Sequence, residues 1–368
     1  MRLAFASLLV VHALIHLMGV VKAFDLAPLE QLKLAISPAV GILWLLAAVL
    51  LMIAAVGWLV AARWFWLAGL LAVVVSQAVI MPAWSDARAG TLPNLVLAAL
   101  VVYAACAWGP FGLRAEYERL VRDAMSESAQ RHNAVVPDTA LLAVPPQVRR
   151  YLEFAGVPGA PPLHAVRVRM TGRIRSSATS EWMPFTADQH SFFDPPRRYF
   201  WMTATRGGLP IDGLHVYGTT DASMRIRLLS LFPVVSMGGP EMMRTETVTV
   251  LNDMCIMAPA RLLDPAIRWR ELDAHSVEAT YSNAGHVVHA VLVFNDEGAL
   301  ENFWSDDRPA LAEDGKTMVP QRWSTPVGDY RAMPPYRLAS RGEAHYAAAS
   351  GEYAYIEFRG IEVSALAN

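Results

Sequence analysis

The sequence predicts a chain of two parts: an α-helical membrane domain of four spans, followed by a soluble domain that is mainly antiparallel β. Residues 1–110 hold only five Lys/Arg and three Asp/Glu, and they contain four apolar stretches long enough for a bilayer core of about 30 Å. From His164 onward, apolar and polar residues instead alternate with period two, as in half-buried strands. These two patterns predict the fold class.

The four apolar stretches place the spans at about residues 3–21, 39–60, 64–81 and 92–108. Aromatic residues gather at their ends, as in the belts that mark membrane interfaces. The second and third spans are so close that they form a tight helical hairpin. The first span could also be read as a cleaved signal peptide, but it carries two histidines and is long for such a segment, so we expect it to remain.

The orientation of the spans follows from the Lys and Arg residues near their ends. Five lie on the N-terminal side and three on the other side: Arg2, Arg63, Arg114, Arg119 and Arg122 against Lys22, Lys33 and Arg88. Four spans return the chain to its starting side. We therefore expect a multi-pass protein of the bacterial inner (cytoplasmic) membrane, with the soluble domain in the cytoplasm.

Several polar residues lie inside or next to the predicted spans, where such residues are costly and suggest function. His12 and His16 are four residues apart, so they share one helix face. Gln77, Asp86 and Asn94 lie in or near the loop that meets the end of the first span. This cluster is either a metal, haem or quinone site, or a set of hydrogen bonds that holds the helices together. We expect neither a metal nor a cofactor, since no second ligand pair accompanies the histidines.

Residues 111–143 form a linker with an amphipathic helix over about residues 113–125 and a polar hinge after it. The soluble domain, residues 144–368, starts with a short helix that has proline at its start and Gly156 after its end. Eleven strand-like segments follow, separated by turn residues such as those after Asp194 and Asp296. They lie at about residues 166–171, 186–194, 199–205, 214–219, 223–229, 276–282, 287–295, 300–305, 321–331, 337–346 and 353–363. Short strands at near-regular spacing predict an antiparallel meander.

One helical segment, about residues 240–263, interrupts the strands. Its apolar residues recur at helical spacing and are rich in methionine. A twisted sheet with a single helix closes when the sheet curls and the helix fills its concave face. The methionines are then either ordinary core or one wall of an adaptable apolar groove. If there is a groove, the residues we expect to bind its ligand are Met243, Met254, Trp182 and Trp201.

The soluble domain resembles an uncharacterised bacterial domain family of unknown function whose members often carry N-terminal membrane helices. The resemblance rests on VPPQVRRYLEFAGVPG, VRVRMTGRIR, EWMPFTADQ, PPRRYFW and LNDMCIMAPARLLDPAIRW, and it covers about residues 144–363. It implies no catalytic residue. The expected architecture also resembles the curved half-barrel of lipoprotein-carrier domains, which hold acyl chains. The first 110 residues loosely resemble small four-span proteins of the DoxX type.

No sequence motif of an established chemistry is present: there is no G-x-S-x-G, P-loop, G-x-G-x-x-G, H-E-x-x-H or C-x-x-C. The net charge of −2 excludes a global field that attracts nucleic acid. We expect a membrane protein whose β-domain binds an apolar or lipid-like molecule from the bilayer without transforming it. The alternative is a membrane-bound redox or lipid-modifying enzyme that uses His12, His16 and Asp86, or Asp253 and Asp306. A third is an assembly partner that pairs through a sheet edge. The oligomeric state stays open.

Overall fold

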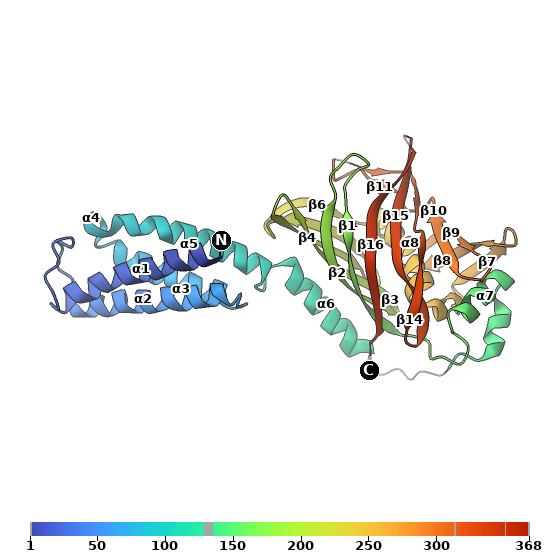
Figure 1. Cartoon of the computed structure of the whole chain (residues 1–368), viewed down its shortest axis with the longest axis horizontal. Helices are drawn as coiled ribbons and strands as arrows, with labels where there is room; N and C mark the ends of the chain where they lie inside the picture. The colour runs from blue at the N-terminus through green and yellow to red at the C-terminus, as the bar shows by residue number, and fades with distance from the viewer. Residues whose placement is uncertain (1, 129–134, 313, 350, 367–368) are drawn as a thin grey trace. The chain divides into compact units, whose positions relative to one another are not determined.

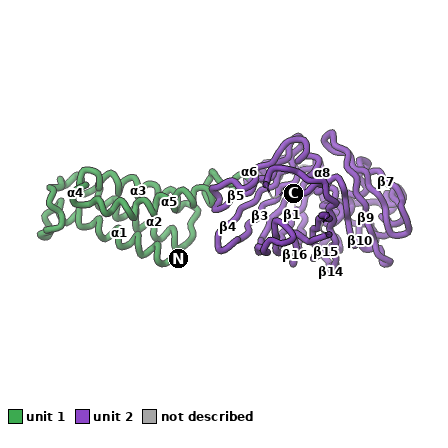
Figure 2. The backbone as a smooth tube through the Cα atoms, turned by 90° about the horizontal axis from the view of Figure 1, so that it is seen from above, with its two compact units in different colours: residues 1–116 green, residues 117–368 purple. Residues whose placement is uncertain are grey.

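The computed structural model describes residues 2–128, 135–312, 314–349 and 351–366. It divides between Glu116 and Tyr117 into two compact units (Figures 1 and 2). The division falls inside α6 (Leu113–Ser128), so the helix expected in the linker belongs partly to each unit.

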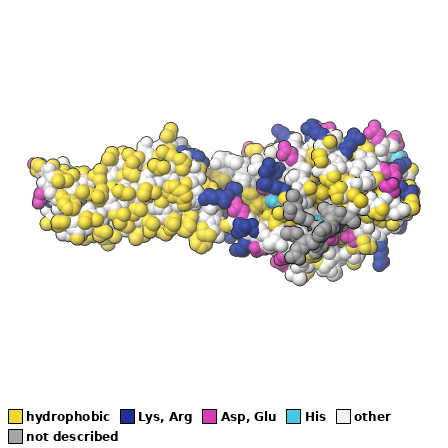
Figure 3. All heavy atoms as spheres, turned by 90° about the horizontal axis from the view of Figure 1, so that it is seen from below, with side chains coloured by type: hydrophobic (Ala, Val, Ile, Leu, Met, Phe, Trp, Pro, Cys, Tyr) yellow, Lys and Arg dark blue, Asp and Glu magenta, His cyan; other side chains and the backbone are white. Residues whose placement is uncertain are grey.

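The first unit consists of four apolar helices that lie side by side (Figure 1). These are α1 (Arg2–Ala23), α2 (Pro38–Leu59), α3 (Phe65–Ile80) and α5 (Thr91–Ala107), with the short α4 (Trp84–Ala87) and η1 (Arg88–Gly90) before α5. Small residues let the helices approach closely. A Cβ atom at Gly19, for example, would lie 2.2 Å from the Trp44 ring. The visible outer face of the unit is almost wholly apolar (Figure 3).

Three helical segments in the described residues are long and apolar enough to cross a bilayer: Arg2–Ala23, Pro38–Leu59 and Trp84–Ala107. The third of these segments begins at Trp84, before the expected start of the fourth span at about residue 92. The short helices α4 and η1 lead directly into α5 and so lengthen it. Helix α3 has 16 residues and is therefore about 24 Å long, shorter than a bilayer core. The expectation of four spans is not confirmed.

The second unit is built on one curved, wholly antiparallel sheet of fourteen strands, which confirms the predicted class of this part (Figure 1). The spatial order is β6-β5-β4-β3-β2-β1-β16-β15-β13-β10-β9-β8-β7, and β14 pairs with β15. The strands of the first half are β1 (Ala165–Ile174), β2 (Met183–Phe193), β3 (Pro196–Arg206), β4 (Leu209–Tyr217), β5 (Ala222–Leu228) and β6 (Phe232–Gly238). Those of the second half are β7 (Ile267–Glu271), β8 (Ser276–Asn283), β9 (His286–Phe294), β10 (Leu300–Ser305), β13 (Arg322–Ser324), β14 (Val327–Met333), β15 (Tyr336–Ala348) and β16 (Gly351–Ala365).

The order shows two meanders rather than one. The chain runs outward from β1 to the edge strand β6, crosses to the opposite edge strand β7, and returns to place β16 beside β1. Helix α8 (Pro240–Met257) makes the crossing, followed by η3 (Pro259–Leu263). The predicted helix over residues 240–263 is thus interrupted at Ala258, because Pro259 disfavours helical backbone in the residue before it.

The observed strands differ from the expected ones in two ways: two strands were not expected, and one expected strand is divided. The edge strands β6 and β7 were not expected, and β6 contains Pro233, a residue that is tolerated at sheet edges. The expected strand over residues 321–331 is two strands, since Pro326 separates β13 from β14. A small hairpin of β11 (Ala310–Leu311) and β12 (Met318–Val319) lies outside the large sheet.

The two faces of the sheet carry different side chains, as the period-two pattern predicts. On β1, Val166, Val168 and Met170 belong to the main core cluster, which also includes most of α8. Arg167 points to the opposite face and pairs with Asp188 of β2. The short helices η2 (Asp138–Ala143) and α7 (Pro146–Phe154) add Leu141, Tyr151 and other residues to the same core. We call the α8 side the concave face.

Candidate functional site

Helix α8 is buried on nearly all sides: 14 of its 18 residues are buried. It contacts strands from both halves of the sheet, among them β5, β6, β9 and β15. A helix buried all round has no solvent face for its polar residues, so they must be paired in the interior. The polar groups of α8 are therefore candidates for a functional site.

A cluster of three buried charges joins α8 to the sheet. Glu246 and Asp253 are seven residues apart, two turns, and so lie on one face of the helix. Arg198 of β3 lies against both: its Nε is 2.9 Å from Asp253 Oδ2 and its Nη1 is 3.2 Å from Glu246 Oε2. Gln189 of β2 completes the cluster: its Oε1 accepts from Arg198 Nη2 at 3.0 Å and its Nε2 donates to Asp253 Oδ2 at 2.6 Å. We call these four residues the Arg198 cluster.

The two carboxyl groups of this cluster differ in their electrostatics. Burial alone would raise the pKa of Glu246, but the hydrogen bond to His215 and the charge of Arg198 outweigh it and hold that pKa at about 2. For Asp253, burial is the larger effect, and it raises the pKa although Arg198 and Gln189 offset part of it. Glu246 is thus ionised, whereas Asp253 is the carboxyl group in the cluster that takes up a proton more readily.

A second buried cation holds the other side of α8. Arg308 donates from Nε to Thr249 Oγ1 at 3.0 Å and also bonds the Tyr346 hydroxyl. Its guanidinium lies 4.3 Å from the centre of the Trp323 ring. Asn252 adds a bond of 2.7 Å to Thr325. Polar bonds thus fix α8 from Glu246 to Asp253, on both sides of the concave face.

The end of the concave face at β3–β6 is rich in methionine. Cross-strand pairing places Phe200, His215, Met224 and Met237 in one row across these strands. The row lies on the concave face, because His215 contacts Glu246 of α8. Met202 lies two residues after Phe200 and shares its face. Met224 and Met237 are only half-buried.

The chain continues from Met237 through Gly239, which has φ of 89°, into Met242 and Met243 at the start of α8. The positive φ favours glycine at this point, where the chain turns from the edge strand into the helix. We call Met202, Met224, Met237, Met242 and Met243 the methionine-rich end.

The four residues expected to bind a ligand do not share one surface. Met243 and Met254 belong to α8 and are buried in the core cluster. Trp201 lies on the opposite face of the sheet, where its ring stacks on Tyr117 of α6 at 6.4 Å between centroids. The guanidinium groups of Arg173 and Arg175 each lie 4.4 Å from the centre of the Trp182 ring. Only the methionines belong to the concave face.

In the first unit, four of the five expected polar residues form one buried hydrogen-bonded network. Asn94 Oδ1 accepts from His12 Nε2 and from Ser76 Oγ, both at 3.0 Å, and Asn94 Nδ2 donates to Gln77 Oε1 at 3.0 Å. His16 Nε2 lies 2.9 Å from Ser76 Oγ. Ser76 was not predicted, because a single serine in an apolar helix carries no sequence signal. The network joins α1, α3 and α5 by hydrogen bonds across helices.

Asp86 does not join this network. Its carboxylate accepts from the backbone N–H groups of Lys33 and Leu34, at 2.6 and 2.9 Å, and so fixes the loop before α2. Among the described residues there is no group of three His, Cys, Asp or Glu that could hold a metal ion. The other expected carboxylate, Asp306, pairs with Arg322 at the surface.

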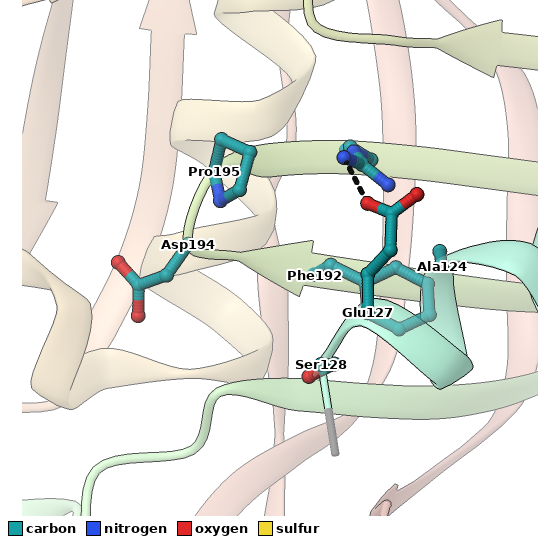
Figure 4. A pocket seen from close by; sticks show the side chains of 7 residues that line it. Ala124, Glu127, Ser128, Phe192, Asp194 and Pro195 are labelled. Carbon is teal, nitrogen blue, oxygen red and sulfur yellow. Dashed lines mark ion pairs between the residues drawn. The ribbon is translucent and has the colours of Figure 1, made fainter. Parts of the chain in front are cut away.

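One small pocket of about 40 Å³ lies on the opposite face of the sheet from α8, between α6 and the β2–β3 turn (Figure 4). Glu127 of α6 and Arg197 of β3 form an ion pair across it, and Asp194 points away from that pair. The volume of this pocket is close to that of one water molecule, which is too small for an organic ligand. The concave face is the better candidate.

Comparison with solved structures finds seven similar chains, among them the following three. A LolA superfamily protein from Nitrosomonas europaea is 10% identical, with a TM-score of 0.28, and the match covers 63% of this chain and 96% of that one. An outer membrane lipoprotein-sorting protein domain from Vibrio parahaemolyticus is 8% identical, with a TM-score of 0.33 and coverage of 63% and 94%. A DUF1329 family protein from Desulfovibrio piger is 10% identical, with a TM-score of 0.31 and coverage of 54% and 85%.

No curated protein matches the chain. Residues 134–358, in contrast, match a family described as a family of unknown function, DUF6544. This agrees with the resemblance seen in the sequence over about residues 144–363. Because the match extends over more than half of the chain, this protein belongs to the DUF6544 family.

Proposed function

We propose that this chain is an integral membrane protein whose curved-sheet unit binds an apolar or lipid-like molecule at the methionine-rich end. The observation that carries the proposal is the gathering of five methionines at one end of an otherwise closed core, with Met224 and Met237 half-buried there. Unbranched, polarisable methionine side chains repack around ligands of different shape. An acyl chain is the kind of ligand that such a surface accommodates.

The contacts that hold α8 in place support a route by which the ligand enters at the start of the helix. Its buried polar bonds to Arg198, Arg308 and Thr325 start at Glu246 and run toward the C-terminus, whereas Arg244, two residues before Glu246, makes a solvent-exposed ion pair with Asp307. The first turns instead hold Met242 and Met243 and follow Gly239, whose backbone freedom suits a hinge. In the proposed function these turns lift slightly and the ligand packs between them and the strands β4–β6, while the Arg198 cluster keeps the rest of the helix in place.

The unit is proposed to bind its ligand without transforming it. The carboxylates that an enzyme would use are engaged with cations, Asp253 with Arg198 and Asp306 with Arg322. The bilayer is the proposed source of the ligand, because three helices are long and apolar enough to cross it.

We further propose that the first unit crosses the bacterial inner membrane with four helices and leaves both its ends in the cytoplasm. The packing of α3 in the bundle and the five-to-three bias of Lys and Arg support this arrangement. A green fluorescent protein fused to the C-terminus tests it: fluorescence in the bacterial host is expected, and a dark fusion of normal abundance would contradict it.

Native mass spectrometry of the full-length protein, released gently from detergent, tests ligand binding. The wild-type protein is expected to carry one more tightly held lipid than the double variant Met224→Gln/Met237→Gln, since glutamine matches methionine in size but puts an amide on the apolar surface. The variant Met333→Gln is the matched control, because Met333 of β14 is also half-buried against the core, away from the site. Equal lipid retention by all three proteins would contradict the proposal.

A further inference from the structure

The turns at one end of the strands β3–β6 carry apolar side chains exposed to solvent beside arginines. The β3–β4 turn exposes Leu209 (46%), and the β5–β6 turn exposes Phe232 (59%) and Val234 (57%). The two turns are neighbours, because the N–H of Leu229 bonds the carbonyl of Pro210 at 2.9 Å. We call residues 206–209 and 227–234 the hairpin tip. It includes the arginines Arg206 and Arg227, for which no ion pair is present among the described residues.

The backbone of the tip adopts a conformation that its residues do not favour. Leu229 and Ser230 have φ of 54° and 58°, the left-handed region in which a two-residue hairpin turn normally carries Asn and Gly. A leucine there costs stability, and local strain of this kind is often retained for function. In a soluble protein, an exposed Leu–Phe–Val cluster is also a liability. The strain and the exposure together indicate that the tip has a partner.

We infer that the hairpin tip docks on the surface of an anionic lipid bilayer. Arginine next to exposed aromatic and aliphatic side chains is the composition of segments that lie in the membrane interface: the cations meet lipid phosphates and the apolar groups enter the acyl boundary. The inference does not rest on ligand binding at the methionine-rich end.

The direction of α6 supports a bilayer as the partner. Tyr117 at its start stacks on Trp201, whereas Glu127 near its end pairs with Arg197, so the helix runs antiparallel to β3. The chain therefore enters this unit from the end of β3 that leads to Arg206, about 17 Å further along the strand from Trp201. The apolar helices precede that point in the chain. The tip thus lies at the end of the sheet from which α6 enters this unit.

Two features disfavour a second copy of the chain as the partner. The edge strand β6 contains Pro233, which has no N–H for a further strand, and the pairing of β5 with β6 shifts register next to it. Self-association through this edge is therefore blocked where the apolar groups are exposed.

The experiment uses the full-length protein, one copy per lipid nanodisc, in a Cys106→Ser background. The remaining Cys255 is completely buried, so it does not react with a label. An environment-sensitive fluorophore is attached through Phe232→Cys, and through Val287→Cys as the matched control, since Val287 is 49% exposed on β9 away from the tip. In discs of phosphatidylcholine with phosphatidylglycerol, the label at 232 is expected to show severalfold weaker iodide quenching than the label at 287, and strong quenching by spin-labelled lipid.

Two further variants make the result specific. The double change Arg206→Gln/Arg227→Gln is expected to raise iodide quenching at 232 toward the control value. Leu229→Asn is expected to raise the thermal midpoint, because asparagine suits the left-handed turn, and yet to weaken the lipid contact. Equal iodide quenching at 232 and 287 in anionic discs would overturn the inference, as would protection of 232 that occurs only when a disc holds two copies.

Discussion

Replacing Arg198 by methionine removes the cation that separates two buried carboxylates. Methionine keeps the apolar stem of the side chain and removes the guanidinium, so the change takes away the charge and its hydrogen bonds while most of the stem packing remains. Arg198 donates to Asp253 at 2.9 Å and to Glu246 at 3.2 Å, and both carboxyl groups are shielded from water. After the substitution, Glu246 keeps its contact with His215 and Asp253 keeps its hydrogen bond from Gln189, but no cation lies between the two carboxyl groups.

The expected loss is large because buried charges are costly to leave unpaired. Breaking a buried ion pair by removing one partner costs about 3–5 kcal/mol, and we expect about 4 kcal/mol here since two carboxylates lose the same cation. For a unit of this size, each kcal/mol shifts the thermal midpoint by about 2–4 °C, so the midpoint of the curved-sheet unit is expected to fall by about 8–16 °C. Tryptophan fluorescence of the full-length protein in detergent measures it.

Two controls separate this cause from a general effect of losing an arginine. Arg270→Met breaks an exposed pair with Glu278 and is expected to leave the midpoint close to that of the wild type. The triple change Arg198→Met/Glu246→Gln/Asp253→Asn is expected to recover most of the loss, because neutral side chains need no counter-ion. A drop of under about 1 kcal/mol for Arg198→Met would refute the assignment of a charged cluster beneath α8.

Three further outcomes follow from other contacts. The pKa of Glu246 in the folded protein is about 2, below its ordinary 4.5, so its carboxylate stabilises the fold above pH 4.5 and this contribution is lost as the pH falls toward 2; Glu246→Gln is therefore expected to flatten the decline of the midpoint with acid. Asn94→Leu removes bonds to His12 and other members of the buried network and is expected to destabilise the helical unit by about 1–2 kcal/mol, measured by detergent-induced unfolding. Tyr117→Phe loses the 2.7 Å bond between its hydroxyl and His190 Nδ1, and a cost of about 1 kcal/mol is expected in the same fluorescence assay as for Arg198→Met.

The sequence predicts those features of the fold that have a local signal. The alternation around Val166 and Met170 marks β1, and the helical spacing of Met243 and Met254 marks α8. The pairing of β1 with β16 has no such signal, because the partners lie almost 200 residues apart and pair only after the sheet has closed. The edge strand β6 also stays hidden, since its short apolar run is interrupted by proline.

The candidate site was only partly predictable. Asp253 could be singled out as a carboxylate among apolar residues, but its partner Arg198 was missed. A signal exists: period-two alternation puts Arg198 on the same face as Phe200 and Met202, so an arginine had to lie in the core. Trp182 and Trp201 show the reverse error, because the count of tryptophans carries no information about which face of the sheet each one occupies.

The most direct test of the central claim is photo-crosslinking with a fatty acid that carries a diazirine near the end of its chain, added to the detergent-purified full-length protein. Adducts are then assigned to individual residues by fragmentation mass spectrometry. Binding at the methionine-rich end predicts adducts on Met237, Met242 or Met243, and their loss in the Met224→Gln/Met237→Gln variant but not in Met333→Gln. Adducts confined to residues 1–110, or unchanged by the double variant, would contradict the account.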